Sequence, residues 1–223
     1  MSLTLYGSPN SQPSRSVQAF LLLTSLPFEF KMVSIIRREN CTSEFLKINP
    51  RHAIPVLQED DFVLDESQAI IFYLMDSRGV GKEYYPEDPK IRALVNQYLP
   101  YHHRQVRPKL VELFRLAYAP QVIKGRKDNI RHDAVELLRQ FEEVFLGNGK
   151  YIAGDVFTIA DIFAVNELTQ VYFNVDMEWS QVLKNYIGRC LEVKALDEVN
   201  KEIRKFREVM KGLKGNIESD GIE

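Results

Sequence analysis

The organisation of the chain is decided by residues 53–74, which read Ala53-Ile-Pro-Val-Leu-Gln-Glu-Asp-Asp-Phe-Val-Leu-Asp-Glu-Ser-Gln-Ala-Ile-Ile-Phe-Tyr-Leu74. Two short apolar runs, Val56-Leu57 and Phe62-Val63-Leu64, flank the polar and acidic residues 58–61. This is the pattern of a tight β-hairpin. The run from Ala69 to Met75 that follows is uniformly apolar, which predicts a helix buried on all sides. The stretch therefore predicts a hairpin that leads directly into a buried helix.

The N-terminus of that helix is a candidate binding site. Free backbone N–H groups at a helix N-terminus attract a carboxylate, and Glu66 beside them suits an ammonium group. A ligand with both charges, such as an amino acid or a γ-glutamyl group, would fit between Ile54-Pro55 and this terminus. The same residues admit a second interpretation, in which Asp65 and Ser67 only cap the helix.

The composition is that of an ordinary globular protein. The chain has 223 residues, of which 45% are hydrophobic and 27% charged, enough for one large or two small domains. A net charge of −2 gives no basis for nucleic-acid binding. No apolar run approaches the ~18 residues that span a bilayer. The first residues lack the basic start and apolar core of a signal peptide.

Cysteine and histidine usage predicts no metal site. Cys41 and Cys190 are the only cysteines, and the four histidines are scattered without the spacing of metal ligands. Two cysteines in a chain of this size favour a reducing compartment, most simply the cytosol.

Strand and helix patterns alternate over the first 76 residues. Leu3 and Leu5 alternate with polar neighbours as in a short strand, and Pro13 suits the first turn of a helix. Residues 28–33 alternate again, and the order β-α-β favours a parallel pair. We therefore expect a compact α/β unit, followed by a linker rich in glycine and proline.

Beyond the linker the pattern is helical. An apolar stripe from Ile91 to Ala117 contains Pro100 and Pro108, which predicts a bent helix or two stacked segments. Residues 130–146 form another amphipathic helix, and 180–191 one more.

The best helix start in the chain lies at Thr158 and Asp161, which have the spacing of a capping box. This box is expected to determine the fold and to have no catalytic role. The last helix carries Val199, Ile203 and Phe206 on one face, and the polar end is expected to be loose.

In this order, the α/β unit and the helices resemble the cytosolic glutathione S-transferases, above all the theta class and the related delta and epsilon classes. The resemblance covers roughly residues 3–208. Four segments carry it: Ser11-Gln-Pro-Ser-Arg-Ser-Val at a theta-like start, Glu44-Phe-Leu-Lys-Ile-Asn-Pro-Arg-His-Ala-Ile-Pro in a delta-like pattern, Tyr98-Leu-Pro-Tyr-His-His-Arg-Gln-Val-Arg107, and Gly154-Asp-Val-Phe-Thr-Ile-Ala-Asp.

The resemblance implies a thioredoxin-like glutathione-binding domain over residues 1–77 and a linker over 78–89. An all-α domain with the electrophile pocket would span 90–211, and a polar tail 212–223. The implied activity is conjugation of reduced glutathione to small hydrophobic electrophiles in detoxification, with peroxidase or dehalogenase side activity. Glutathione would be a cosubstrate, without a further cofactor or metal, and the protein would be a cytoplasmic homodimer.

The resemblance also implies residue roles in binding glutathione. Pro55 would be a cis-proline that presents the Ile54 backbone to the cysteinyl part. Glu66 and Ser67 would hold the γ-glutamyl ammonium and carboxylate. Asn40 stands where the family usually has a histidine that contacts the glycyl end.

Two further residues near the glycyl and thiol positions have open interpretations. His52 either supplies part of the glycyl contact or is a surface loop histidine. Arg107 either steadies the thiolate or an anionic substrate, or is a solvated charge. Pro100 is unusual among theta relatives and would reshape the electrophile pocket.

Ser11 would donate a hydrogen bond to the glutathione sulfur. A free thiol has a pKa of ~8.5, so a hydroxyl donor at a helix N-terminus raises the thiolate fraction at neutral pH. Two alternatives stay open: Ser11 as a simple N-cap, and Tyr6 as the activating hydroxyl. Cys41 lies in the wrong place for a redox cysteine, which would occupy the Ser11 position.

A non-catalytic protein-interaction module is the competing function. Domains of this family also serve as assembly parts, and Asn40 mildly favours that role. The presence of Ser11, Ile54-Pro55 and Glu66-Ser67 argues against it, because a scaffold does not need them.

Overall fold

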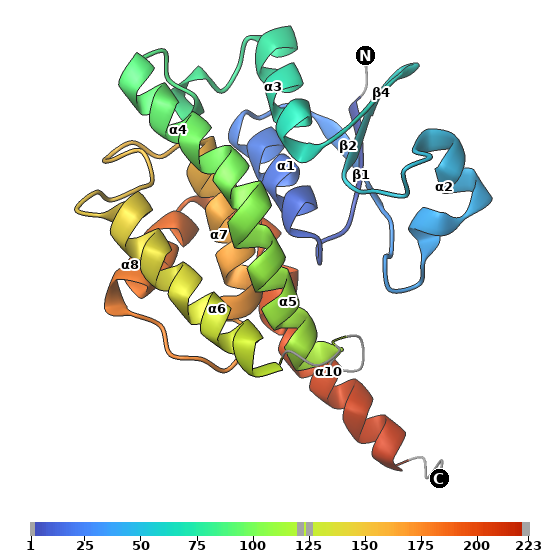
Figure 1. Cartoon of the computed structure of the whole chain (residues 1–223). Coiled ribbons are helices and arrows are strands. Elements are labelled where there is room, and N and C mark those ends of the chain that lie inside the picture. The colour runs from blue at the N-terminus through green and yellow to red at the C-terminus, as the bar shows by residue number, and fades with distance from the viewer. Residues whose placement is uncertain (1–2, 120–122, 124–126, 220–223) are drawn as a thin grey trace.

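The structure is a computed structural model that describes residues 3–119, 123 and 127–219. A small sheet with its own helices forms one part of the molecule, and a bundle of helices forms the other (Figure 1). This arrangement confirms the predicted fold class, a thioredoxin-like α/β unit followed by an all-helical part. Within the described residues, none of the helices combines the length and apolarity needed to cross a membrane.

The sheet has four strands in the order β2-β1-β3-β4. β1 (Leu3–Gly7) pairs in parallel with β2 (Phe28–Met32) and antiparallel with β3 (Val56–Glu59). β3 continues into β4 (Phe62–Asp65) as an antiparallel hairpin. Both the parallel pair and the hairpin predicted from the sequence are confirmed.

Helices cover both faces of this sheet. α1 (Gln12–Leu23) and α3 (Ser67–Arg78) pack against each other on the face toward the helical part (Figure 1). The 3-10 turn η1 (Glu39–Cys41) and α2 (Ser43–Ile48) lie on the other side.

The prediction that the helix after the hairpin is buried on all sides is wrong. Ile70, Ile71 and Leu74 of α3 are fully buried, but Ala69 is exposed and Phe72 only half-buried. The apolar run is uniform, yet α1 and the sheet cover only one side of the helix.

After the 3-10 turn η2 (Lys82–Tyr84), the remaining elements are all helical or irregular within the described residues. They are α4 (Pro89–Tyr101), the π-helical turn η3 (His102–Val106), α5 (Arg107–Tyr118), α6 (Lys127–Gln140), the π-helical turn η5 (Phe141–Leu146), α7 (Ile159–Tyr172), α8 (Gln181–Leu191), α9 (Lys194–Val199) and α10 (Lys201–Ser219). The apolar stripe with two prolines thus forms two helical segments, α4 and α5, as predicted.

α7 is the centre of the helical part. Every residue from Ile159 to Val171 is buried, and α1, α4, α5 and α8 all pack against this helix. Asp161 fixes its start, because its Oδ2 accepts from the Thr158 backbone at 2.8 Å and from the Thr158 hydroxyl at 3.1 Å. The predicted capping box is confirmed.

The prediction of a loose end over residues 212–223 is wrong for residues 212–219, which are helical, and its last residues, 220–223, lie outside the described residues. α10 continues without interruption to Ser219 and projects from the body of the molecule (Figure 1). Helix formation propagates at little cost once a long helix exists, so Gly212 and Gly215 do not end it.

Candidate functional site

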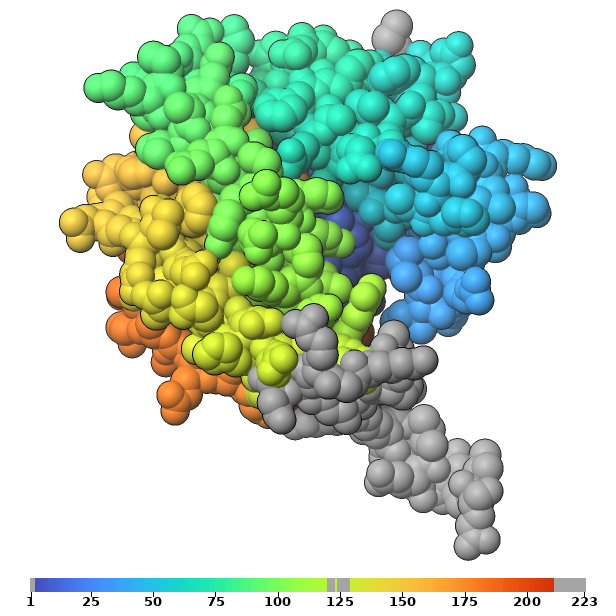
Figure 2. All heavy atoms as spheres, in the orientation of Figure 1, coloured from blue at the N-terminus to red at the C-terminus, as the bar shows by residue number. Residues whose placement is uncertain are grey.

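Two adjoining pockets lie where the sheet part meets the helical part. Figure 2 shows the hollow at the centre of one face, with α1 in dark blue at its bottom and α5 in green beside it. The small pocket has a volume of about 150 Å³ and the large pocket about 410 Å³. Gln12, Ala53, Ile54 and Arg107 line both, so the two pockets form one continuous site.

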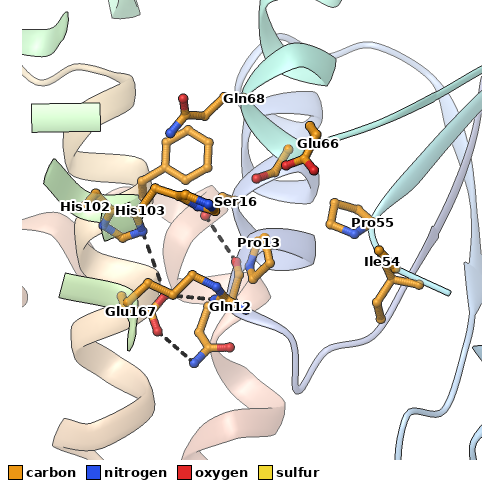
Figure 3. A pocket seen from close by; sticks show the side chains of 14 residues that line it. Gln12, Pro13, Ser16, Ile54, Pro55, Glu66, Gln68, His102, His103 and Glu167 are labelled. Carbon is orange, nitrogen blue, oxygen red and sulfur yellow. Dashed lines mark hydrogen bonds and ion pairs between the residues drawn. The ribbon is translucent and has the colours of Figure 1, made fainter. Parts of the chain in front are cut away.

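The small pocket contains five of the predicted site residues, namely Ile54, Pro55, Glu66, Ser67 and Arg107. The Ile54–Pro55 peptide bond is cis, and both residues line the wall on which Glu66 also lies (Figure 3). Glu66 and Ser67 come from the junction of β4 and α3. Glu66 has a φ of +66°, a conformation that few non-glycine residues adopt and that turns the chain from the hairpin into the helix.

α3 begins without a side-chain cap among the described residues. Asp65 accepts hydrogen bonds from Arg51 Nε at 2.7 Å and Asn49 Nδ2 at 3.1 Å, so its carboxylate is already engaged. The interpretation of Asp65 and Ser67 as mere helix caps is therefore wrong. The first N–H groups of α3 remain available as donors where Ser67 lines the small pocket.

A buried carboxylate, Glu167 of α7, lies on the opposite side of the small pocket (Figure 3). Its Oε1 accepts from Gln12 Nε2 at 3.0 Å, and its Oε2 accepts from Arg107 Nη1 at 3.1 Å. Burial raises the pKa of Glu167, while the Arg107 charge pulls it down. These contacts fix Gln12 and Arg107 at the junction of the two pockets.

His102 is buried next to Glu167 and is neutral. Burial and, to a lesser extent, the nearby positive charge of Arg107 together lower the pKa of His102 to about 3. The His102 Nδ1 lies 3.0 Å from the Tyr98 hydroxyl, and its Nε2 lies 3.8 Å from Glu167. Because the imidazole is uncharged, the positive charge near Glu167 comes from Arg107, which contacts it, and from the buried Arg15.

The π-helical turn η3 brings His102, His103 and Arg107 into the same pocket. Pro108 lacks an N–H, and its ring crowds the preceding turn, which favours a wider turn at this point. A π-helical turn places residue i beside residue i+5, so His102 and Arg107 share one face.

Ser11 lies at the N-cap of α1 and lines the large pocket. Its Oγ accepts a long hydrogen bond from the Ser14 backbone at 3.4 Å. A hydroxyl that accepts in this way still has its own hydrogen to donate. The N-cap position and a donor role toward the pocket are therefore compatible.

Tyr6 lies elsewhere. Its hydroxyl donates to Gln58 Oε1 at 3.0 Å, and its ring packs edge-on against Phe45. It lines neither pocket. These contacts give no support to the alternative in which Tyr6 is the activating hydroxyl.

Arg15 holds the loop before Ser11 in place. Its fully buried guanidinium donates to Pro9 O at 2.9 Å, Gln170 Oε1 at 2.9 Å and Asn166 O at 2.6 Å. Burial lowers the pKa of Arg15 to about 9, with Arg107 acting in the same direction. The loop is thereby tied across the interface to α7.

His52 lies at the wall of the large pocket, and Asn40 contacts His52 from outside that wall. His52 lines the large pocket and has a φ of +57°, whereas Asn40 lines neither pocket. The Asn40 side chain instead donates to the His52 carbonyl at 2.8 Å. Asn40 thus supports the loop that leads to Ile54.

Sequence reasoning missed Gln12, Arg15, His102 and Glu167. Gln12 and Arg15 lie inside the theta-like segment that begins at Ser11. The signal for Glu167 was a charged residue in the middle of a predominantly apolar helix, where a buried charge demands a partner. Cys41 lines neither pocket, and no metal-binding group of side chains occurs in the part of the chain that the structure describes.

Comparisons with known proteins assign this arrangement to one family. Residues 5–82 match the family described as glutathione S-transferase, N-terminal domain, and residues 106–180 match glutathione S-transferase, C-terminal domain. The chain is 34% identical to human glutathione S-transferase theta-2 over 175 residues, which is 76% of this chain and 72% of the relative.

An insect protein and a solved structure extend these matches. Glutathione S-transferase 1 of Manduca sexta is 30% identical over 207 residues, 90% of this chain and 93% of the relative. The crystal structure of human glutathione transferase theta-2, a complex with glutathione and an unknown ligand, has a TM-score of 0.87 and 28% identity. That similarity covers 94% of this chain and 90% of the human one.

Proposed function

Because this chain belongs to the glutathione S-transferase family, we propose that it conjugates reduced glutathione to small hydrophobic electrophiles with the help of the Ser11 hydroxyl. Residues 1–77 would bind glutathione and residues 90–211 would supply the electrophile pocket, joined by the linker 78–89.

The small pocket binds the γ-glutamyl end in this proposal. The uncapped N–H groups of α3 donate to the α-carboxylate, and Glu66 accepts from the ammonium. This pairing of an uncapped helix N-terminus with an adjacent carboxylate is the observation that carries the proposal.

The rest of glutathione then extends toward the large pocket. The Ile54 backbone, next to the cis peptide bond, pairs with the cysteinyl part. His52 lies nearest to the glycyl end, and Asn40 acts behind it by holding the His52 carbonyl. The neutral Asn40 gives this end no charge of its own.

The extended ligand brings its sulfur to Ser11 at the N-terminus of α1. A hydrogen bond from the hydroxyl and the partial positive charge of the helix terminus both favour the thiolate. The thiolate attacks the electrophilic carbon, and its leaving group departs with the bonding electron pair. Arg107, held by Glu167, adds a positive charge at the junction of the pockets.

Ser11→Ala, Ser11→Thr and Tyr6→Phe test the thiol activation. We expect Ser11→Ala to bind glutathione within about threefold of the wild type, and to lose about 10- to 100-fold in kcat, because one hydrogen bond to an anion is removed. Ser11→Thr keeps both the cap and the donor and should recover most of the rate. Tyr6→Phe is the control.

Calorimetry measures glutathione binding, and turnover is followed with a chloronitrobenzene and an alkyl halide. Loss of rate in Tyr6→Phe, or full rate in Ser11→Ala, contradicts the proposal. If the wild type does not bind millimolar glutathione, the protein-interaction module takes its place. An organic hydroperoxide added to the same assay tests the peroxidase side activity, and the alkyl halide tests dehalogenation.

We also propose a cytoplasmic homodimer that acts in detoxification. Two free cysteines suit a reducing compartment. Apolar side chains are exposed on both parts of the molecule, with Phe62 and Val63 of β4 at 43% and 38% and Leu94 of α4 at 42%. Light scattering on the purified chain tests the dimer, and Leu94→Glu is expected to weaken it.

A further inference from the structure

The large pocket is a trough along one face of α5. Arg107, Val111, Phe114 and Arg115 all line it, and their spacing of i, i+4, i+7 and i+8 puts them on one side of the helix. With a rise of 1.5 Å per residue, the two arginines are about 12 Å apart along the helix axis. The trough therefore has a cationic side chain near each end.

Arg107 marks the inner end of the trough. It also lines the small pocket, together with Gln12, and Ser11 lies next to Gln12. Arg115 belongs to the large pocket alone, two turns farther along α5. An electrophile whose reacting carbon meets a sulfur at Ser11 thus points its far end toward Arg115.

Between the two arginines, the trough has apolar side chains on its walls, and the aromatic ones are held in place by packing. Ile35 and Ile36 stand on the opposite wall with 45% and 74% of their surface exposed. The Phe114 ring packs against Phe206 of α10 with centroids 5.5 Å apart. Tyr118 completes this aromatic group and is fixed by its hydrogen bond to Asn174 O at 2.8 Å. Such walls suit an apolar chain or ring.

The charges of the two arginines differ in availability. Arg107 is paired with Glu167 at 3.1 Å. The Arg115 side chain is exposed, and its guanidinium has no ion-pair or hydrogen-bond partner among the residues that the structure describes. None of the described residues that line the large pocket is acidic. The outer end of the trough therefore offers an unpaired guanidinium, which matches a carboxylate bidentately.

We propose that the large pocket selects electrophiles that carry a carboxylate, or another compact anion, remote from the reacting carbon, and that Arg115 binds this group. The inference rests on the proposed function, because it assumes that the reaction takes place at Ser11. The anion is retained in the product. With an ω-bromoalkanoate, the thiolate forms a C–S bond, the C–Br bond breaks, and bromide leaves with the electron pair.

The first test compares ω-bromoalkanoates of four to twelve carbons with their methyl esters. We expect the ratio of kcat/KM between acid and ester to peak at about tenfold at a length that spans the trough, since hydrogen bonds to charged groups are strong. The ratio should fall with added salt, because the group lies near the surface.

Four variants identify the residue responsible. Arg115→Gln should lower the ratio to about one, Arg115→Lys should restore part of it, and Arg115→Glu should invert it. Lys109→Gln removes a positive charge from α5 outside both pockets and should leave the ratio unchanged.

A second measurement needs no turnover. Calorimetry with S-(ω-carboxyalkyl)glutathione and with its methyl ester should show the same preference, lost in Arg115→Gln. Equal affinities for acid and ester, or an equal effect of Lys109→Gln, overturn the inference while the proposed function stands. If the acid conjugate binds with the Arg115-dependent preference but neither the bromoalkanoates nor the chloronitrobenzene react, the proposed function fails and the anion-binding site at Arg115 remains.

Discussion

The small and large pockets differ in what holds their walls. The small pocket rests on buried polar groups that have partners, such as Glu167 with Gln12 and Arg107. The large pocket has polar side chains too, but most of its wall surface is apolar and belongs to side chains such as Ile36, which is 74% exposed. A polar network fixes one geometry, whereas apolar walls accept many shapes. The difference suits one invariant cosubstrate beside a variable electrophile.

The largest expected effect comes from Arg15, whose buried guanidinium ties the loop before Ser11 to α7. Arg15→Met leaves the acceptors of Pro9, Asn166 and Gln170 without their donor. We expect a loss of about 3–5 kcal/mol in the free energy of unfolding, measured in urea. Arg139→Met breaks the exposed ion pairs with Glu136 and Glu143 and should cost far less. Equal losses of unfolding free energy in the two variants would mean that the buried contacts of Arg15 stabilise the fold no more than an exposed ion pair does.

The second prediction concerns pH and His102. The unfolded chain protonates this residue near its ordinary pKa of 6.5, whereas burial lowers the folded pKa to about 3. Stability is therefore complete above pH 6.5 and is lost as the pH falls, by roughly 2 kcal/mol down to pH 5. His102→Gln should flatten this dependence.

Urea unfolding at several pH values measures the slope for each variant. His132→Gln removes an exposed histidine and is the control. The prediction fails if both variants flatten the curve alike, because the burial of His102 would then not be the cause.

Glu66→Gln separates the pockets by function. Loss of the charge opposite the ammonium should raise the glutathione Kd about tenfold, and leave the KM of the electrophile within about twofold. Asp76→Asn, at the exposed other end of α3, should change neither. Calorimetry and steady-state kinetics give both values. A matching change in the electrophile KM would show that the pockets do not act separately.

Phe206→Ala should have the opposite selectivity, affecting the electrophile and not glutathione, and it has the smallest expected effect. Removing part of the apolar wall should raise the electrophile KM about fivefold, with the glutathione Kd unchanged. Val209→Ala, on the exposed side of α10 at 57%, is the matched control. A glutathione Kd that rises with the KM would remove the distinction between a polar and an apolar pocket.

Some of the site could be read from local patterns, and some could not. Ile54-Pro55 and Glu66-Ser67 flank one hairpin, so a short stretch placed them together. The Tyr6 alternative stayed open because alternation along β1 did not reveal which partner its hydroxyl would meet. Only the fold shows that this partner is Gln58 on the neighbouring strand. The roles of Ser11, Asn40 and Arg107 in turnover stay predictions.

By itself, the sequence determined the parallel pair of β1 and β2, the β3–β4 hairpin, the capping box at Thr158 and the family, because these depend on residues close together or on a recurrent order of segments. Tertiary structure alone decided that Gln12 meets Glu167, 155 residues away. It also decided that one side of α3 is left uncovered by other elements, and that Arg107 and Arg115 line the same pocket. The physical reason is that the periodicity of a sequence determines which side chains share a face of a helix or strand, whereas tertiary packing determines what that face contacts.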